Sequence, residues 1–76
     1  MMDDNKMKIS AKSIIMGVGQ GASYFHVGEE LNAHIITHFE TFFVTGEMAY
    51  VTWYRVMSDD IKLIELNQSY VSQIIY

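Results

Sequence analysis

The sequence contains neither cysteine nor proline, and only five of its 76 residues are lysine or arginine. Without cysteine the chain forms no disulfide bonds and holds no metal ion through thiolates. Without proline, low-complexity segments or internal repeats, no linker divides the chain. We therefore expect one small domain over residues 1–76, with the polar residues 1–5 frayed.

Positive charge is scarce, because nine acidic residues outnumber the five basic ones and the net charge is −4. A surface that binds a phosphate backbone needs several basic contacts, so nucleic acid is not the expected partner. Long apolar runs are also missing. No run approaches the ~20 residues of a membrane span, and the first residues do not resemble a signal peptide. We expect a cytoplasmic protein outside the membrane.

Hydrophobic residues are abundant, since they make up 50% of the chain and include five Tyr, four Phe and one Trp. A chain of this length buries only about 60% of its unfolded surface, so its stability depends on a dense apolar core or on self-association. Some aromatic surface should therefore lie at the surface or in an interface. A homodimer is one arrangement that this composition favours.

Alternation of polar and apolar residues predicts a mostly β fold. Met7, Ile9 and Ala11 alternate with lysine and serine, which predicts a first strand from Lys6 to Met16. Further strands are predicted at 23–27, 35–44, 48–57, 61–66 and 70–76, with Ile61, Leu63 and Glu65 on one side of their strand. We expect a small antiparallel meander or barrel of five to six strands, because closure removes exposed edges.

The segment 29–44 also fits a helix. Leu31, Ile35 and Phe39 recur at near-helical spacing, and Gly46 stands where a helix would end. The alternative fold is therefore α+β, with a helix at about 29–44 packed on an antiparallel sheet. We favour strand, because five β-branched residues stand beside three phenylalanines in this segment.

Residues that could carry catalysis or bind a metal are few. His34 and His38 would share one helix face, with Glu30 or His26 to complete a metal site. On a strand the same two histidines stand about 13 Å apart at ~3.3 Å per residue, which is too far for one ion. No cysteine or serine stands in a nucleophile motif, and the glycines of 17–21 lack the context of a dinucleotide site. We predict no enzyme activity, no cofactor and no metal.

The predicted hairpin from Ile35 to Met57 has two different faces. A two-residue turn at Thr45 and Gly46 places Val44 opposite Glu47. The uncharged face, expected in the core, then consists of Ile35, Thr37, Phe39, Thr41 and Phe43 with Met48, Tyr50, Thr52, Tyr54 and Val56. The mixed face consists of His34, Ile36, His38, Glu40, Phe42 and Val44 with Glu47, Ala49, Val51, Trp53, Arg55 and Met57.

The mixed face has the aromatic and arginine content of protein-binding hot spots, because Trp53 lies beside Phe42 and Arg55. The candidate partner-binding residues are Trp53, Arg55, Phe42, His38, Glu40 and Tyr54. The alternative is structural: Trp53 packs under another strand and Arg55 pairs with Glu40.

These patterns predict a small protein-binding module that docks on a larger protein and inhibits or modulates it. In size and charge the chain is similar to small phage-encoded inhibitors of host or defence proteins, such as anti-restriction and anti-CRISPR proteins. That resemblance covers no motif, so it assigns no functional residue. Two alternatives stay open. One is a small β-barrel that binds a small ligand or single-stranded nucleic acid by stacking on aromatic residues, and the other is a structural homo-oligomer.

Overall fold

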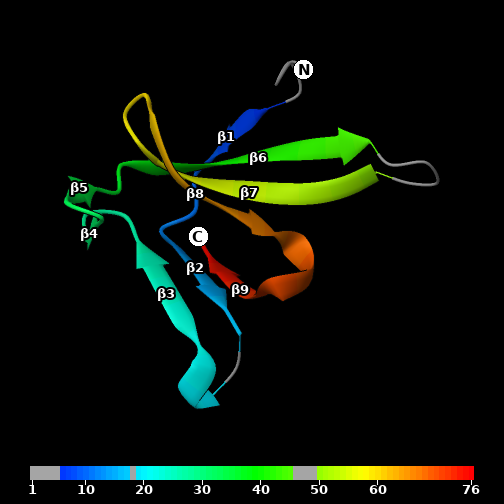
Figure 1. Cartoon of the computed structure of the whole chain (residues 1–76), viewed down its shortest axis with the longest axis horizontal. Coiled ribbons are helices and arrows are strands. Elements are labelled where there is room, and N and C mark those ends of the chain that lie inside the picture. Colours follow the sequence, from blue (N-terminus) through cyan, green and yellow to red (C-terminus); the bar gives the residue numbers. More distant parts are fainter. Residues whose placement is uncertain (1–5, 18, 46–49) are drawn as a thin grey trace.

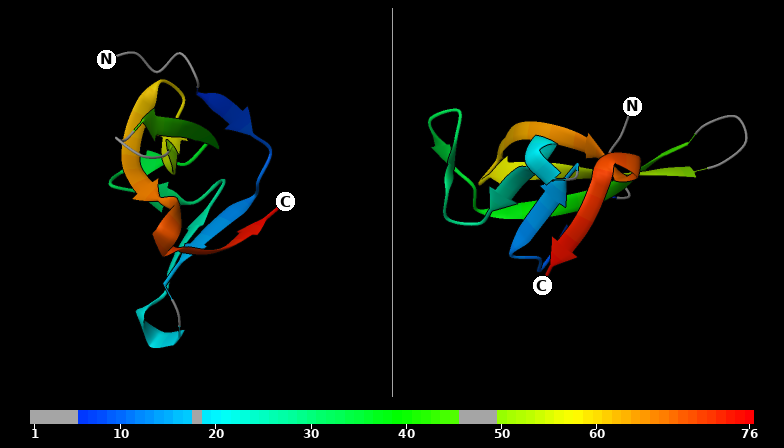
Figure 2. Two further views of the ribbon diagram at one scale, coloured as in Figure 1. Left: turned by 90° about the vertical axis from the view of Figure 1, so that its right-hand side faces the viewer. Right: turned by 90° about the horizontal axis from the view of Figure 1, so that it is seen from below.

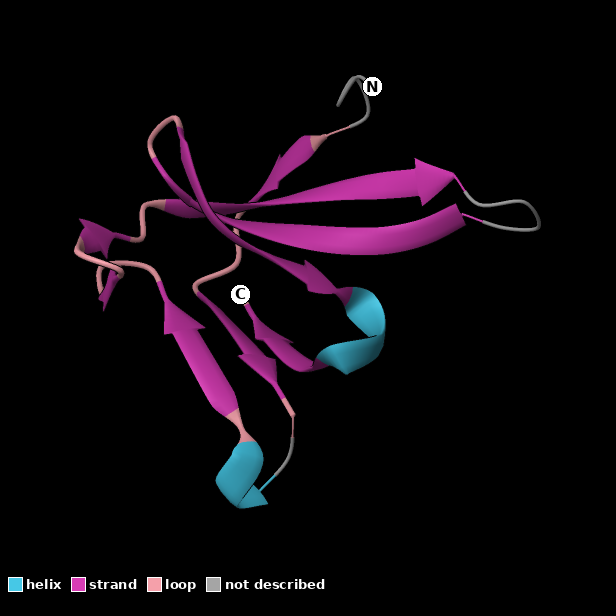
Figure 3. Cartoon of the chain, viewed as in Figure 1, coloured by secondary structure: helices cyan, strands magenta, loops and turns pink. Residues whose placement is uncertain are grey.

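The computed structural model describes residues 6–17, 19–45 and 50–76, and most of them lie in antiparallel strands (Figure 1). The strands are β1 (Met7–Ile9), β2 (Ser13–Met16), β3 (Ser23–His26), β4 (Glu30–Leu31), β5 (His34–Ile35), β6 (His38–Thr45), β7 (Tyr50–Ser58), β8 (Ile61–Asn67) and β9 (Val71–Ile75). Two 3-10 turns, η1 (Gly19–Gly21) and η2 (Gln68–Tyr70), are the helical elements that Figure 3 shows in these ranges.

The prediction of a mostly β fold is confirmed. The alternative helix at 29–44 is not formed, because that segment contains β4, β5 and most of β6. The β-branched and aromatic residues of 35–44 thus outweigh the near-helical spacing of their apolar side chains. In the part of the chain that the structure describes, no helix has the length and apolar character to cross a membrane.

The strands form two main sheets that remain open. The larger sheet has the order β1-β6-β7-β8, the second has the order β3-β2-β9, and β4 and β5 make a small separate hairpin. Neither sheet closes on itself, so the barrel variant of the predicted fold does not form. Figure 2 shows the two sheets crossing at a steep angle. The core lies between them.

The predicted first strand, from Lys6 to Met16, is broken into two strands that belong to different sheets. β1 pairs with β6, whereas β2 pairs with β3 and β9. Both Ala11 and Ile14 are buried. Because their separation is odd, one flat strand would turn them to opposite faces. The chain therefore bends between them and passes from one sheet to the other.

The core joins the inner faces of the two sheets. Phe39, Val56 and Leu66 contribute from the larger sheet, and Ile14 and Phe25 contribute from the second sheet. Four of these side chains are almost completely buried, and Phe39 is the largest of them. The prediction that Phe39 and Val56 share the core face of the hairpin is confirmed, because they are direct cross-strand partners.

The start of the predicted hairpin strand differs from expectation. Ile35 was assigned to the core face, but it lies in β5 and is 50% exposed, whereas its neighbour Ile36 is 2% exposed and belongs to the core. The chain leaves β5 and enters β6 at this point. Thr37 fixes the junction, because its backbone N–H donates to the Met57 carbonyl and its hydroxyl accepts from the Asp59 N–H at 2.7 Å.

The register of the β6–β7 hairpin also differs from the two-residue-turn prediction. Val44 pairs with Val51 instead of Glu47, so each residue of β6 meets a partner four positions further along β7. An even shift keeps Phe39 and Val56 on one face and Phe42, Trp53 and Arg55 on the other, as predicted. The residues between the strands, 46–49, include part of the predicted turn and lie outside the described residues.

The turn between β4 and β5 contains a conformation that alanine tolerates poorly. Asn32 and Ala33 both have positive φ, at 54° and 69°. Two consecutive residues of this kind are typical of a type I′ turn, in which the second position favours glycine. Asparagine accepts this geometry readily, but the Cβ of alanine is crowded in it.

We expect Ala33→Gly to stabilise the fold by up to about 1 kcal/mol, because it removes this crowding. Thermal unfolding followed by circular dichroism should show a rise of a few degrees in Tm, since about 1 kcal/mol corresponds to ~4–8 °C in a domain of this size. Ala22→Gly is the control, because Ala22 has no positive φ. It should lower Tm. A lower Tm for Ala33→Gly would contradict the assignment of strain to this turn.

Candidate functional site

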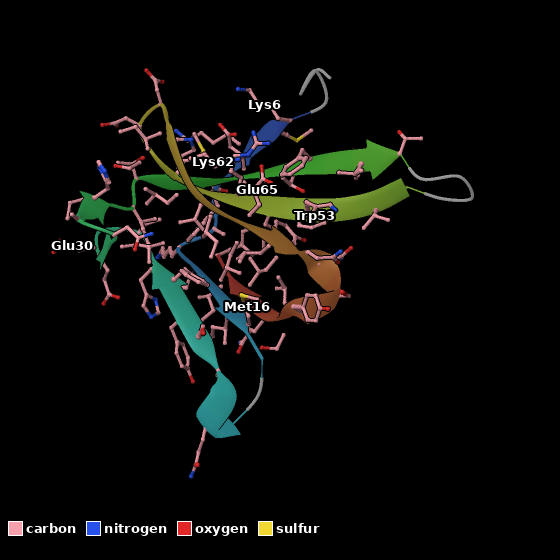
Figure 4. The ribbon with its side chains drawn as sticks, viewed as in Figure 1. Lys6, Met16, Glu30, Trp53, Lys62 and Glu65 are labelled. Atoms are coloured by element: carbon pink, nitrogen blue, oxygen red, sulfur yellow. The ribbon has the colours of Figure 1, made fainter. Side chains whose placement is uncertain are left out.

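Most of the predicted partner-binding residues gather on one face of the larger sheet, which we call the outer face because it points away from the core. β7 lies between β6 and β8 in this sheet. Arg55 of β7 has Glu40 of β6 on one side and Glu65 of β8 on the other, all in direct register. One step towards the hairpin tip, Trp53 of β7 stands opposite Phe42 of β6. Figure 4 shows Trp53 and Glu65 over these central strands.

Arg55 is the centre of the outer face. Its Nε and Nη2 atoms each lie 3.1 Å from Oε2 of Glu65, and its Nη1 lies 3.6 Å from Oε1 of Glu40. Its guanidinium carbon also lies 4.2 Å from the centroid of the Phe42 ring, which is a cation–π geometry. The residue is only 7% exposed. A guanidinium so placed is held by its neighbours and offers little surface to a partner.

Two further charged side chains extend the cluster. His38 Nε2 lies 3.3 Å from Oε2 of Glu40, and Lys62 Nζ lies 3.6 Å from Oε2 of Glu65. The other oxygen of Glu40, Oε1, is buried and makes no hydrogen bond in the described part of the chain. Its negative charge is balanced by the nearby guanidinium of Arg55. Arg55 therefore offsets the burial of Glu40 by charge attraction.

Lys62 and Glu65 share the outer face because β8 contains a bulge. The pairing shifts between Val56 and Met57, so that Val56 meets Ile64 while Met57 meets Lys62. One extra residue in β8 turns Lys62 to the face of Glu65. The predicted grouping of Ile61, Leu63 and Glu65 on one side is wrong for this reason, since Leu63 packs against the core while Glu65 binds Arg55.

The aromatic part of the cluster lies next to the charged part. The rings of Phe42 and Trp53 are stacked with their centroids 6.4 Å apart and an interplanar angle of 25°. Phe42 is buried, with the Arg55 guanidinium against its ring, and Trp53 is half-buried. The predicted contact between Trp53 and Phe42 is therefore formed. Arg55 also pairs with Glu40, as the structural alternative expected.

Tyr54 is the one predicted site residue that the fold separates from the others. It points to the inner face of β7, opposite Thr41 of β6, and is 9% exposed as a member of the core. Burial raises the pKa of the Tyr54 hydroxyl above its usual value of 10.0, and electrostatic repulsion from Tyr76 raises this pKa further. It cannot share a contact surface with Trp53 on the outer face.

Sequence reasoning missed two groups of residues at this site. Lys62 and Glu65 were not candidates, although an arginine on a central strand needs carboxylates on both sides and Glu65 could have supplied one. Val44 and Val51 were placed on the mixed face but not among the candidates. They are 44% and 38% exposed. The sequence alone did not indicate that β6 and β7 are long enough to expose these two residues near the hairpin tip.

The histidines considered as metal ligands for a helical segment lie on three different strands. His34 lies in β5 and His38 in β6, while His26 of β3 bonds through its ring to the Ser13 hydroxyl at 2.5 Å. Among the described residues, no three histidine, cysteine, aspartate or glutamate side chains gather as a metal ion would require.

Comparisons with known proteins add no functional assignment. No family model, curated protein or solved structure matches this chain. The function must therefore be inferred from the residues and their geometry.

We expect Arg55→Ala to lower the free energy of unfolding by about 3–5 kcal/mol, because it removes the cation that Glu40 and Glu65 share from either side of β7. Lys62→Ala is the matched control. Lys62 also contacts Glu65, but its side chain is 56% exposed, so its loss should cost less than about 1 kcal/mol. Urea unfolding of both variants measures the difference. Equal losses would show that Arg55 does not hold the outer face together.

We expect Tyr54→Phe to reduce the sensitivity of the fold to alkaline pH. A raised pKa in the folded state means that the stability contributed by neutral Tyr54 is complete below the unfolded pKa near 10 and is lost as pH rises through the folded pKa. Stability measured from about pH 9 to about pH 11 should therefore fall less in Tyr54→Phe than in the wild type. Tyr70→Phe, at a residue 66% exposed, should keep the wild-type slope. The same slope in all three proteins would refute the prediction.

Proposed function

We propose that this chain is a small protein-binding module that docks on a larger protein through the outer face of the β6–β7 hairpin, and that it inhibits or modulates that protein. The observation that carries the proposal is an exposed apolar pair, Val44 and Val51, which continues the Phe42–Trp53 stack towards the hairpin tip. Figure 1 shows this hairpin extending past the rest of the fold.

The charged cluster supports such a surface without being its main contact. Arg55 is almost fully buried, so Trp53, Val44 and Val51 offer the accessible surface, while Arg55, Phe42 and Glu40 hold the strands beneath them. A platform whose side chains are already fixed loses little conformational entropy on binding. Lys62 and Glu65 are partly exposed at its border and supply the polar rim that protein interfaces usually have.

The chemistry of the outer face supports a protein partner over a nucleic acid. Two of its cations, Arg55 and Lys62, lie within 4 Å of Glu65, a third, Lys8, stands opposite Glu40, and the chain as a whole has a net charge of −4. Phosphates would compete with these carboxylates for the same cations. In size and acidity the chain is similar to phage-encoded inhibitors, so we extend the proposal to a cytoplasmic host or defence protein as the partner.

We expect Val44→Lys and Val51→Lys each to weaken capture of the partner at least ~tenfold, because both place a charge in the apolar centre of the proposed interface. The measurement is quantitative capture from a lysate of candidate host cells, with every variant first shown to be folded. The matched control is Val27→Lys, since Val27 is 43% exposed and Val44 is 44% exposed. It should capture as much as the wild type.

Equal capture by all three variants would contradict docking through the outer face. A partner that is another copy of the chain would instead support the homo-oligomer, and sedimentation of the purified wild type would reveal it as a concentration-dependent mass. Binding of a generic oligonucleotide that strengthens at low salt would favour the nucleic-acid alternative.

A further inference from the structure

The outer edge of β9 is open. In the described part of the chain β9 pairs with β2 on one side and ends its sheet on the other. The carbonyl of Ile75 accepts a hydrogen bond from the backbone N–H of Lys12, so the polar groups of Ile75 face inward to the sheet. Because successive residues of a strand point to opposite sides, the backbone N–H and carbonyl of Ile74 face away from β2. Such a row of groups can pair with another strand.

A groove of about 290 Å³ runs along this open edge. Four consecutive residues of β9, 71–74, line it, together with Tyr54, Gln68 and Tyr76. Because consecutive residues of one strand form its wall, the groove follows the backbone of β9. None of the lining residues carries a charged side chain.

Tyr54 brings the inner face of β7 to this groove. Tyr54 marks its buried part, and Phe43 lies on the same face nearer the tip, where it is 43% exposed. Figure 1 shows that β6 and β7 extend further than β9. The second sheet therefore covers only part of the inner face. A strand added beside β9 would lie along the uncovered part.

The edges of the larger sheet carry lysines that hinder such pairing, whereas β9 has a bulge at Ser72 but no charged residue. β1 has only three residues and includes Lys8, whereas β8 contains a bulge and Lys62. Lysines, bulges and short strands are the usual means by which proteins block edge pairing. At the other edge of the second sheet, the carbonyl of His26 in β3 already accepts a hydrogen bond from the backbone N–H of Glu29. The sequence of β9, Val-Ser-Gln-Ile-Ile, contains no charge and no proline.

We propose that β9 accepts an extended, uncharged segment of a partner protein as an added β-strand, with alternate apolar side chains directed to the inner face of the hairpin. We expect the segment to be uncharged, because the lining residues include no Asp, Glu, Lys or Arg that could pair with a charged side chain. This site lies on the opposite face of the hairpin from Val44 and Val51. It stands even if docking through the outer face fails.

The test uses the ¹⁵N-labelled chain and a synthetic peptide of about eight alternating Val and Thr residues with blocked ends, which is neutral and favours extended backbone. Amide hydrogen exchange of Ile74 should slow at least ~tenfold at saturating peptide, because an added strand accepts a hydrogen bond from this N–H. The amide signals of Ser72 and Tyr54 should shift. The same peptide with every backbone nitrogen methylated is the control, and it should change nothing.

Three results would overturn the proposal. One is unchanged exchange of Ile74 at the highest soluble peptide concentration. Another is equal protection at the edges of β3 and β8, which would indicate general adhesion to strands. The third is protection of Ile74 without peptide that grows with chain concentration, because a second copy would then occupy the edge. Val44→Lys should leave the peptide effect unchanged, so this measurement separates the β9 site from the outer-face site.

Discussion

A guanidinium placed on the central strand of a sheet must be paired before its neighbours can pack over it. Arg55 meets this constraint through carboxylates on both adjacent strands and an aromatic ring beside it. Glu40 and Phe42 tie β7 to β6, and Glu65 ties it to β8, so the cluster helps to align the three strands. In this register the side chains of Phe39 and Val56 point to the inner face, where they belong to the same core cluster as Ile14 of the second sheet. The core and the outer face therefore depend on one register.

Side-chain alternation is the property of the hairpin that could be predicted from sequence. Phe39 and Val56 were expected on the core face, and Phe42, Trp53 and Arg55 on the other, which is where they lie. The predicted pairing was wrong by four positions, yet the faces survived because four is an even number. The contacts of Phe42 with Trp53 and of Glu40 with Arg55 were expected from the shared face, but their direct cross-strand pairing needed the true register. That register depends on contacts distributed over three strands.

Breaks in alternation could not be predicted in the same way. Nothing in the sequence around Ala11 distinguishes a bend between two sheets from one continuous strand. Likewise, Ile36 is buried in place of Ile35 because Thr37 is hydrogen-bonded to Met57, a contact that the sequence does not reveal. The bulge in β8 is similar. Its extra residue carries Lys62 to the face of Glu65, and only the packing of Leu63 against the core selects that arrangement. These features arise from tertiary contacts.

Strand length explains why a domain with such a well-paired centre still exposes so much apolar surface. β6 and β7 have eight and nine residues, whereas β2 and β9 have four and five. The second sheet can therefore cover only the inner part of the hairpin. Beyond it, Phe43 is exposed on the inner face while Val44 and Val51 are exposed on the outer face. On the outer face, Val44 and Val51 are direct cross-strand partners, so their exposed side chains form one continuous apolar surface. The two faces present different chemistry to the partners that we propose. The outer face offers side chains on a rigid platform, and the inner face offers the unpaired backbone of β9 beside it.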